Sequence, residues 1–167
     1  MGLQFSVLCS GSTGNATVVS SDAATVLVDV GLSARKVEEL MKEREVSGAD
    51  LDAIFVTHEH SDHIKGLGAM ARKFNLPVYA NEKTWTAMHK SIGELPDEQR
   101  HILPTGTAME IYDLRIESYA ISHDAAEPVG YCFRAGGRKL SLATDLGYVS
   151  DKVMEQLKQS DVLVLEA

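Results

Sequence analysis

Short apolar runs rich in β-branched residues recur along the whole chain. Runs of this length, bounded by polar or glycine-containing segments, are typical of buried strands. We therefore predict strands at residues 3–8, 16–19, 25–30, 51–56, 114–121, 129–133, 140–144 and 162–165.

Segments with helical spacing of apolar residues separate several of these runs. They predict helices at residues 34–44, 64–74, 82–90 and 151–159, with Ser33 as the N-cap of the first. Strands come first and then alternate with helices, an order that predicts an α/β fold (α+β by strict class) in which helices cover a mixed sheet. Residues 91–104, which hold two of the four prolines, are expected to form a surface loop.

The length of 167 residues predicts one domain spanning residues 1–167. Its last apolar run has no turn or tail after it, which predicts that the C-terminal part of the domain is missing. The sequence shows neither a secretory leader nor a run of about eighteen apolar residues, so a cytoplasmic protein without membrane contact is expected. The two cysteines, Cys9 and Cys132, are expected to be separate reduced thiols.

The net charge of the chain bears on whether it could bind nucleic acid. Asp and Glu outnumber Lys and Arg by 24 to 16, which gives a net charge of -8 and no global positive field that would gather nucleic acid. A polyanionic substrate would need local attraction, which bound divalent cations can supply.

Several predicted strands lead directly into a residue that can bind a metal ion. Asp29, His58, His123, Asp145 and Glu166 each follow an apolar run. Because the loops at the carboxyl ends of parallel strands converge, we expect these side chains to gather at one sheet edge.

The densest group of such residues is the HxHxDH motif His58-Glu59-His60-Ser61-Asp62-His63. Two histidines separated by one residue can face a single cation, and Asp62 and His63 can then reach a second. Imidazole and carboxylate together suit zinc or manganese, and iron or nickel also fit. The segment begins like HExxH, but position 62 is Asp and the motif follows a strand, which excludes a helical zincin site.

With these residues the sequence resembles the metallo-β-lactamase fold superfamily. The resemblance implies a four-layer αββα sandwich, of which the chain would hold roughly the N-terminal two-thirds. It also implies two divalent metal ions. Asp29 would orient the ligands of these ions without binding an ion itself. The implied ligands are His58, His60 and His123 for the first ion, Asp62 and His63 for the second, and Asp145 between both.

Two segments, Leu8-Cys-Ser-Gly-Ser-Thr-Gly-Asn15 and His58-Glu-His-Ser-Asp-His-Ile-Lys-Gly66, look specifically like the YycJ/WalJ family of bacterial 5′ to 3′ DNA exonucleases. DNA is then the expected substrate. In that family the last metal-binding histidine comes from a segment beyond residue 167, so the second metal site is expected to be incomplete in this chain.

The glycine-containing segment after the first predicted strand has two interpretations. It is either a plain turn between two strands or part of a substrate cleft in which backbone N–H groups hold a phosphate. The residues of the second interpretation are Ser10, Ser12, Gly14 and Asn15.

The expected reaction is hydrolysis of a phosphodiester. Two cations about 3.5 to 4 Å apart can share a hydroxide that attacks in line, while Asp62 orients this hydroxide and accepts its proton. Two alternatives stay open. The same site could hydrolyse a small phosphodiester, a thioester or a lactam, or the chain could be a non-catalytic metal-binding fragment.

Overall fold

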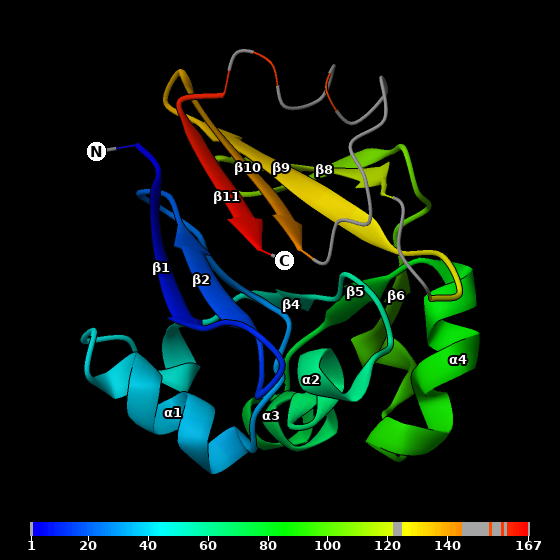
Figure 1. Cartoon of the computed structure of the whole chain (residues 1–167). Coiled ribbons are helices and arrows are strands. Elements are labelled where there is room, and N and C mark those ends of the chain that lie inside the picture. The colour runs from blue at the N-terminus through cyan, green and yellow to red at the C-terminus, as the bar shows by residue number, and fades with distance from the viewer. Residues whose placement is uncertain (1, 122–124, 145–153, 155–157, 159, 167) are drawn as a thin grey trace.

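Figure 1 shows a computed structural model of the chain, which describes residues 2–121, 125–144, 154, 158 and 160–166. The strands in this part of the chain form two sheets. One sheet has six strands in the order β1-β2-β3-β4-β5-β6, and the other has five in the order β11-β10-β9-β8-β7.

The six-stranded sheet begins with an antiparallel meander, β1 to β3, and continues with parallel pairs from β3 to β6. The parallel part places the carboxyl ends of β3 and β4 side by side at one edge. The strands of the six-stranded sheet are β1 (Gln4–Cys9), β2 (Ala16–Ser20), β3 (Thr25–Val28), β4 (Ala53–Phe55), β5 (Val78–Ala80) and β6 (Arg100–Ile102).

The five-stranded sheet is antiparallel except for the parallel pair of β10 and β11. Its strands are β7 (Ala108–Ile111), β8 (Leu114–Ala120), β9 (Val129–Ala135), β10 (Arg138–Thr144) and β11 (Val162–Glu166).

Helices cover the face of the six-stranded sheet that points away from the other sheet (Figure 1). As predicted, Ser33 caps the first helix, because its side chain accepts a hydrogen bond from Lys36 N at 3.3 Å. The helices are α1 (Ala34–Lys42), α2 (Ser61–Ile64), α3 (Leu67–Phe74) and α4 (Glu82–Ile92), with 3-10 turns η1 (Gly48–Asp50) and η2 (Asp97–Gln99).

Two hydrophobic clusters hold these layers together. In β3, Leu27 points into the cluster beneath the helices, whereas Val26 and Val28 point into the cluster between the two sheets. Successive side chains of a strand face opposite sides, so a strand that is apolar at every position must be covered on both faces. The six-stranded sheet is therefore the central layer of a helix–sheet–sheet arrangement.

The mixed sheet covered by helices that the residue pattern predicted is the six-stranded sheet, and the second sheet is the layer that only the implied αββα sandwich predicted. All eight predicted strands are found, with shifted ends, but β5, β6 and β7 were not predicted. Residues 91–104 are not simply a surface loop, since they contain η2 and the edge strand β6. β6 escaped the apolar pattern because it is short and largely exposed.

The helix predicted at residues 64–74 is interrupted. α2 and α3 are separated at Gly66, where a Cβ atom would lie 2.2 Å from Leu32 O. The backbone at Gly66 approaches the segment after β3 so closely that position 66 requires glycine, and α2 ends before it. The helix predicted at residues 151–159 lies almost wholly outside the described residues.

Candidate metal centre

The neighbouring parallel strands β3 and β4 deliver the first residues of the site. Asp29 follows β3, and its N–H donates to Phe55 O at 2.8 Å, so the ladder between the strands continues to this point. Asp29 then takes a left-handed backbone conformation, with φ of 63°. Asp tolerates this region better than most residues, and such a conformation is often found at functional sites. The turn brings the Asp29 carboxylate against the segment that follows β4.

His63 and Asp29 form a buried pair. His63 Nδ1 lies 2.6 Å from Asp29 Oδ2, and the two side chains are 0% and 2% exposed. An ionised carboxylate can only accept, so Nδ1 carries the hydrogen and Nε2 keeps its lone pair. Asn15 Nδ2 lies 3.2 Å from Nε2, but the two hydrogens of this amide also have three oxygen acceptors within 3.2 Å, so the tautomer is set by Asp29. This arrangement is the one found behind metal-binding histidines, whose second nitrogen donates to a carboxylate.

The remaining motif residues lie around this pair. The ring of His58 is 3.9 Å from that of His63 and 4.8 Å from that of His60, between ring centroids. Asp62 Oδ2 lies 3.8 Å from His63 Nε2. This separation is within the roughly 4.2 Å that two metal–ligand bonds of about 2.1 Å can span. The side chains of His58, His60, Asp62 and His63 therefore lie close together in the structure.

The loop after β1 holds the motif in place through hydrogen bonds. Asn15 N donates to Asp62 O at 2.8 Å, and Asn15 Nδ2 lies 3.1 Å from the same oxygen. The Asn15 side chain also accepts from Gly11 N at 3.2 Å, which fixes the loop. Of the four predicted cleft residues, Gly14 and Asn15 are buried, whereas Ser10 and Ser12 are exposed.

The β8–β9 connection reaches the motif from the other sheet. Val129 N donates to Thr57 O at 2.9 Å, and Ala126 N donates to Glu59 Oε2 at 2.9 Å. These contacts place the described residues that follow position 124 against the motif. Two predicted ligands, His123 and Asp145, lie outside the described residues. Within the described ranges, no group of three or more His, Cys, Asp or Glu side chains is arranged to hold a metal ion.

Two contributors to the site were not predicted, Thr57 and Glu59. Thr57 makes two hydrogen bonds to Asp29, from N to Oδ1 at 2.8 Å and from Oγ1 to Oδ2 at 2.7 Å. A threonine at the end of a strand is common, so the sequence alone gives it no special role. The only signal was its place directly before His58.

Comparisons with known proteins identify the family of the chain. A family model described as the Beta-lactamase superfamily domain matches residues 24–167. The chain belongs to the β-lactamase superfamily.

One relative, Exodeoxyribonuclease YycJ of Bacillus anthracis, is 52% identical to this chain over 167 residues. Exodeoxyribonuclease WalJ of Streptococcus pneumoniae serotype 2 is 43% identical over 169 residues. Both matches cover 100% of this chain but only 63% of the relative. The resemblance seen in the motifs is thereby confirmed.

A solved structure shows the same fold at low sequence identity. The metallo-β-lactamase fold protein YhfI from Bacillus subtilis superposes with a TM-score of 0.76 at 16% identity, over 98% of this chain and 71% of that one. The predicted metallo-β-lactamase fold is confirmed. No helix among the described residues of the superfamily chain is long and apolar enough to cross a membrane.

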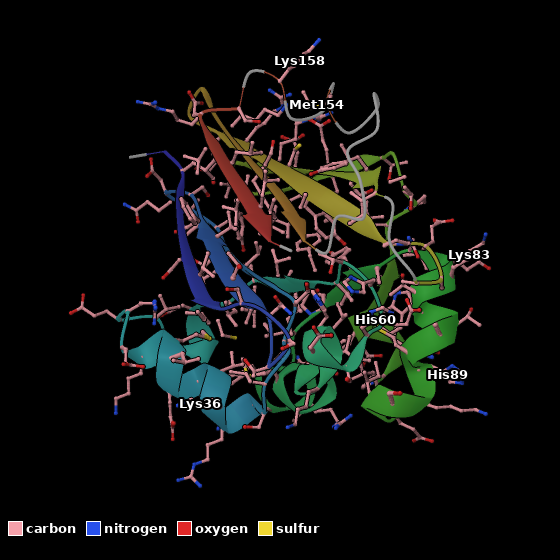
Figure 2. All side chains as sticks on the ribbon, viewed as in Figure 1. Lys36, His60, Lys83, His89, Met154 and Lys158 are labelled. Atoms are coloured by element: carbon pink, nitrogen blue, oxygen red, sulfur yellow. The ribbon has the colours of Figure 1, made fainter. Side chains whose placement is uncertain are left out.

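Beside the motif, the superfamily chain has an open groove of about 930 Å³ along the first turn of α4. Ala126, which binds Glu59, is in its wall, together with Asn81, Lys83 and Ile102. In Figure 2, His60 lies beside α2, and Lys83 and His89 extend from α4. Lys83 Nζ is 3.8 Å from Glu127 Oε1, so the groove carries charges of both signs.

The electrostatic influence of the site extends into the second sheet. The Tyr131 hydroxyl of β9 donates to Val56 O at 2.6 Å. Burial, and next the charge of Asp29, raise the pKa of this phenol well above its usual range. The hydroxyl therefore stays protonated and links the two sheets at the site.

Proposed function

We propose that this chain holds two divalent metal ions and hydrolyses phosphodiester bonds in DNA, as part of a 5′ to 3′ exonuclease. The observation that carries the proposal is the buried His63–Asp29 pair inside an HxHxDH motif. A buried carboxylate that fixes one nitrogen of a histidine leaves the other as a metal ligand. The names of the two exodeoxyribonuclease relatives, which match along the whole chain, support DNA as the substrate.

The proposed ligands are those that the resemblance to the metallo-β-lactamase superfamily implies. His58 and His60, with His123, would hold one ion, Asp62 and His63 the other, and Asp145 would bind both. Zinc or manganese suits this set of nitrogen and carboxylate donors. When bound, the ions would supply Lewis-acid chemistry by polarising a phosphoryl oxygen.

Asp62 is the residue we propose for proton transfer. Its side chain is 26% exposed, whereas Asp29 and His63 are buried. The bonds from Asn15 hold its backbone in place. A carboxylate that is fixed at its base and open at its tip can orient an attacking water and accept its proton.

The exposed residues Ser10 and Ser12 are proposed to border the substrate. Their loop is tied to Asp62 through Asn15, so a phosphodiester at the motif would lie close to their backbone N–H groups. Backbone N–H groups of this kind bind anionic oxygens without a formal positive charge.

The two cysteines form no disulfide, which supports a reducing compartment such as the cytoplasm.

The test is degradation of defined DNA by protein loaded with manganese or zinc. The full-length protein is used, because this chain spans only 63% of the length of its exonuclease relatives. We expect nucleotides to be released from the 5′ end of a linear, 5′-phosphorylated duplex, and a closed circular DNA to stay intact. His60→Ala removes a metal ligand and should lower the rate by more than about 100-fold, the upper range for residues that only support a ligand.

His89→Ala is the matched control. His89 lies on the exposed side of α4, where its Nδ1 donates to Thr86 O at 3.0 Å, so its loss should leave the rate unchanged. A folded, metal-loaded protein that releases no nucleotides would refute the proposal. Equal cleavage of circular and linear DNA would refute its exonuclease part.

A further inference from the structure

Thr57 occupies the centre of the hydrogen bonds behind the motif. Its side chain is fully buried. Oγ1 lies 2.7 Å from Asp29 Oδ2, 3.0 Å from His58 Nδ1 and 3.3 Å from His63 Nδ1. A hydroxyl has a single hydrogen to donate but two lone pairs with which to accept. The partners of Oγ1 therefore decide which of these contacts it donates to.

The partners leave one arrangement. Asp29 Oδ2 can only accept, so the Thr57 hydrogen goes to Asp29. Oγ1 then offers His58 only its lone pairs, and His58 Nδ1 must donate to it. This places the hydrogen of the His58 ring on Nδ1 and the ring lone pair on Nε2.

We infer that Thr57 is a positioning residue, which passes the orienting effect of Asp29 on to His58. The Asp29 carboxylate contacts His63 directly, at 2.6 Å, and reaches His58 through the Thr57 hydroxyl. One buried carboxylate thus fixes the tautomer of a histidine at each end of the motif. The inference rests on the proposed metal centre, since a fixed tautomer matters because it presents Nε2 to a cation.

The backbone of Thr57 is itself held on both sides. Its N–H donates to Asp29 Oδ1 at 2.8 Å, and its carbonyl accepts from Val129 N at 2.9 Å. The backbone that carries the hydroxyl is therefore held in place by contacts that involve only protein groups. Such support is what distinguishes a precise metal site from a loose one.

Three variants of the full-length protein separate this role from packing. Thr57→Val keeps the shape and removes the hydroxyl, and Thr57→Ser keeps the hydroxyl. Thr84→Val is the matched control, because Thr84 is also buried, at 1% exposure, while its Oγ1 has no hydrogen-bond partner within the described structure.

Two measurements are made on each variant. Nitrogen NMR of the imidazole rings in metal-free protein reports which nitrogen of His58 is protonated. Calorimetric titration with zinc reports the number of ions bound and their affinities.

We expect His58 of the unmodified protein and of Thr57→Ser to carry its hydrogen on Nδ1. Thr57→Val should give a mixture of tautomers and weaken zinc binding at the His58 site by about 10- to 100-fold, the usual effect of losing a residue that orients a metal ligand. Thr84→Val should change neither the tautomer nor the affinity.

The inference is overturned if His58 in the unmodified protein is protonated on Nε2, and this result does not depend on any variant folding. It is also overturned if Thr57→Val keeps both the Nδ1 tautomer and the zinc affinity. Neither readout involves DNA. A protein that shows the expected tautomers and zinc affinities but cleaves no DNA would therefore refute the proposed function alone.

Discussion

Gly31 lies where the segments after β1, β3 and β4 meet. Its N–H donates to Asn15 O at 2.8 Å, and a Cβ atom at this position would lie 1.8 Å from Asp62 O and 2.4 Å from Asn15 N. Both obstacles are backbone atoms, so a side chain cannot be accommodated by a change of rotamer. We expect Gly31→Ala to lower the free energy of unfolding by about 3 kcal/mol, at the upper end for overpacking, as measured by urea denaturation.

Gly11→Ala is the control for this substitution. A Cβ at Gly11 meets no atom within 4 Å, and the cost is confined to the positive φ of 97°. That cost is about 1 to 2 kcal/mol, the penalty of a Cβ atom in the left-handed region. If Gly31→Ala proves as stable as Gly11→Ala, the close packing described around Asp62 is incorrect.

At this scale the sequence revealed which residue types take part, but not how they are connected. The motif from His58 to His63 could be found because spacing alone brings its histidines together. The roles of Thr57 and Asn15 depend on the left-handed turn at Asp29 and on the approach of a loop distant in sequence. No local pattern encodes either feature.

The loop between β1 and β2 supports α2 through Asn15. Asn15 Nδ2 lies 3.2 Å from both Asp62 Oδ2 and His63 Nε2, in addition to its bonds with backbone oxygens. We expect Asn15→Ala and the similarly sized Asn15→Leu to weaken binding at the metal site of Asp62 and His63 by about 10- to 100-fold. Zinc titration of the full-length protein measures this loss.

Gln99→Ala provides the comparison for the Asn15 variants. Gln99 is a buried amide that donates to Ala71 O at 2.7 Å and Leu76 O at 2.9 Å, away from the motif. Its loss should destabilise the fold but leave zinc affinity unchanged. Equal effects of the Asn15 and Gln99 variants on zinc binding would show that Asn15 contributes only to general stability.

A strand could be predicted where the apolar run in the sequence is long, even when the strand itself is short, as it is for β4 within the run 51–56. β8 and β10 each span seven residues and were found, whereas β5 and β6 span three and were missed. A three-residue strand is stable only because its neighbours pair with it. That information lies in the fold and not in the segment.

In the whole molecule, the site depends on contact between the two sheets. The sequence predicted apolar strands correctly, but a strand that is apolar on both faces can be covered by helices or by another sheet. The inter-sheet cluster, which includes Phe55 and Tyr131, shows that the second sheet covers one face. Their rings are 5.6 Å apart in an edge-on arrangement. The metallo-β-lactamase resemblance supplied this layer order, which periodicity could not.

Tyr131 makes this inter-sheet contact sensitive to alkaline pH. Its phenol pKa is raised well above 10 by burial and by Asp29, whereas in the unfolded chain it returns to about 10. Above pH 10 the unfolded state therefore releases a proton that the native state keeps. The stabilisation is fully present below pH 10, and the free energy of unfolding falls by up to about 1.4 kcal/mol per pH unit from there to the native pKa.

Tyr131→Phe tests this linkage. Loss of the bond to Val56 O should cost about 1 kcal/mol at pH 7, while the decline of stability above pH 10 should become shallower. Urea denaturation at several pH values from 8 to 11 measures both effects. Tyr112→Phe, at a position 73% exposed, should leave the decline as it is in the unmodified chain. If Tyr131→Phe declines as steeply as the unmodified chain, other groups control the alkaline response, and the inter-sheet hydroxyl does not couple the site to the stability of the fold.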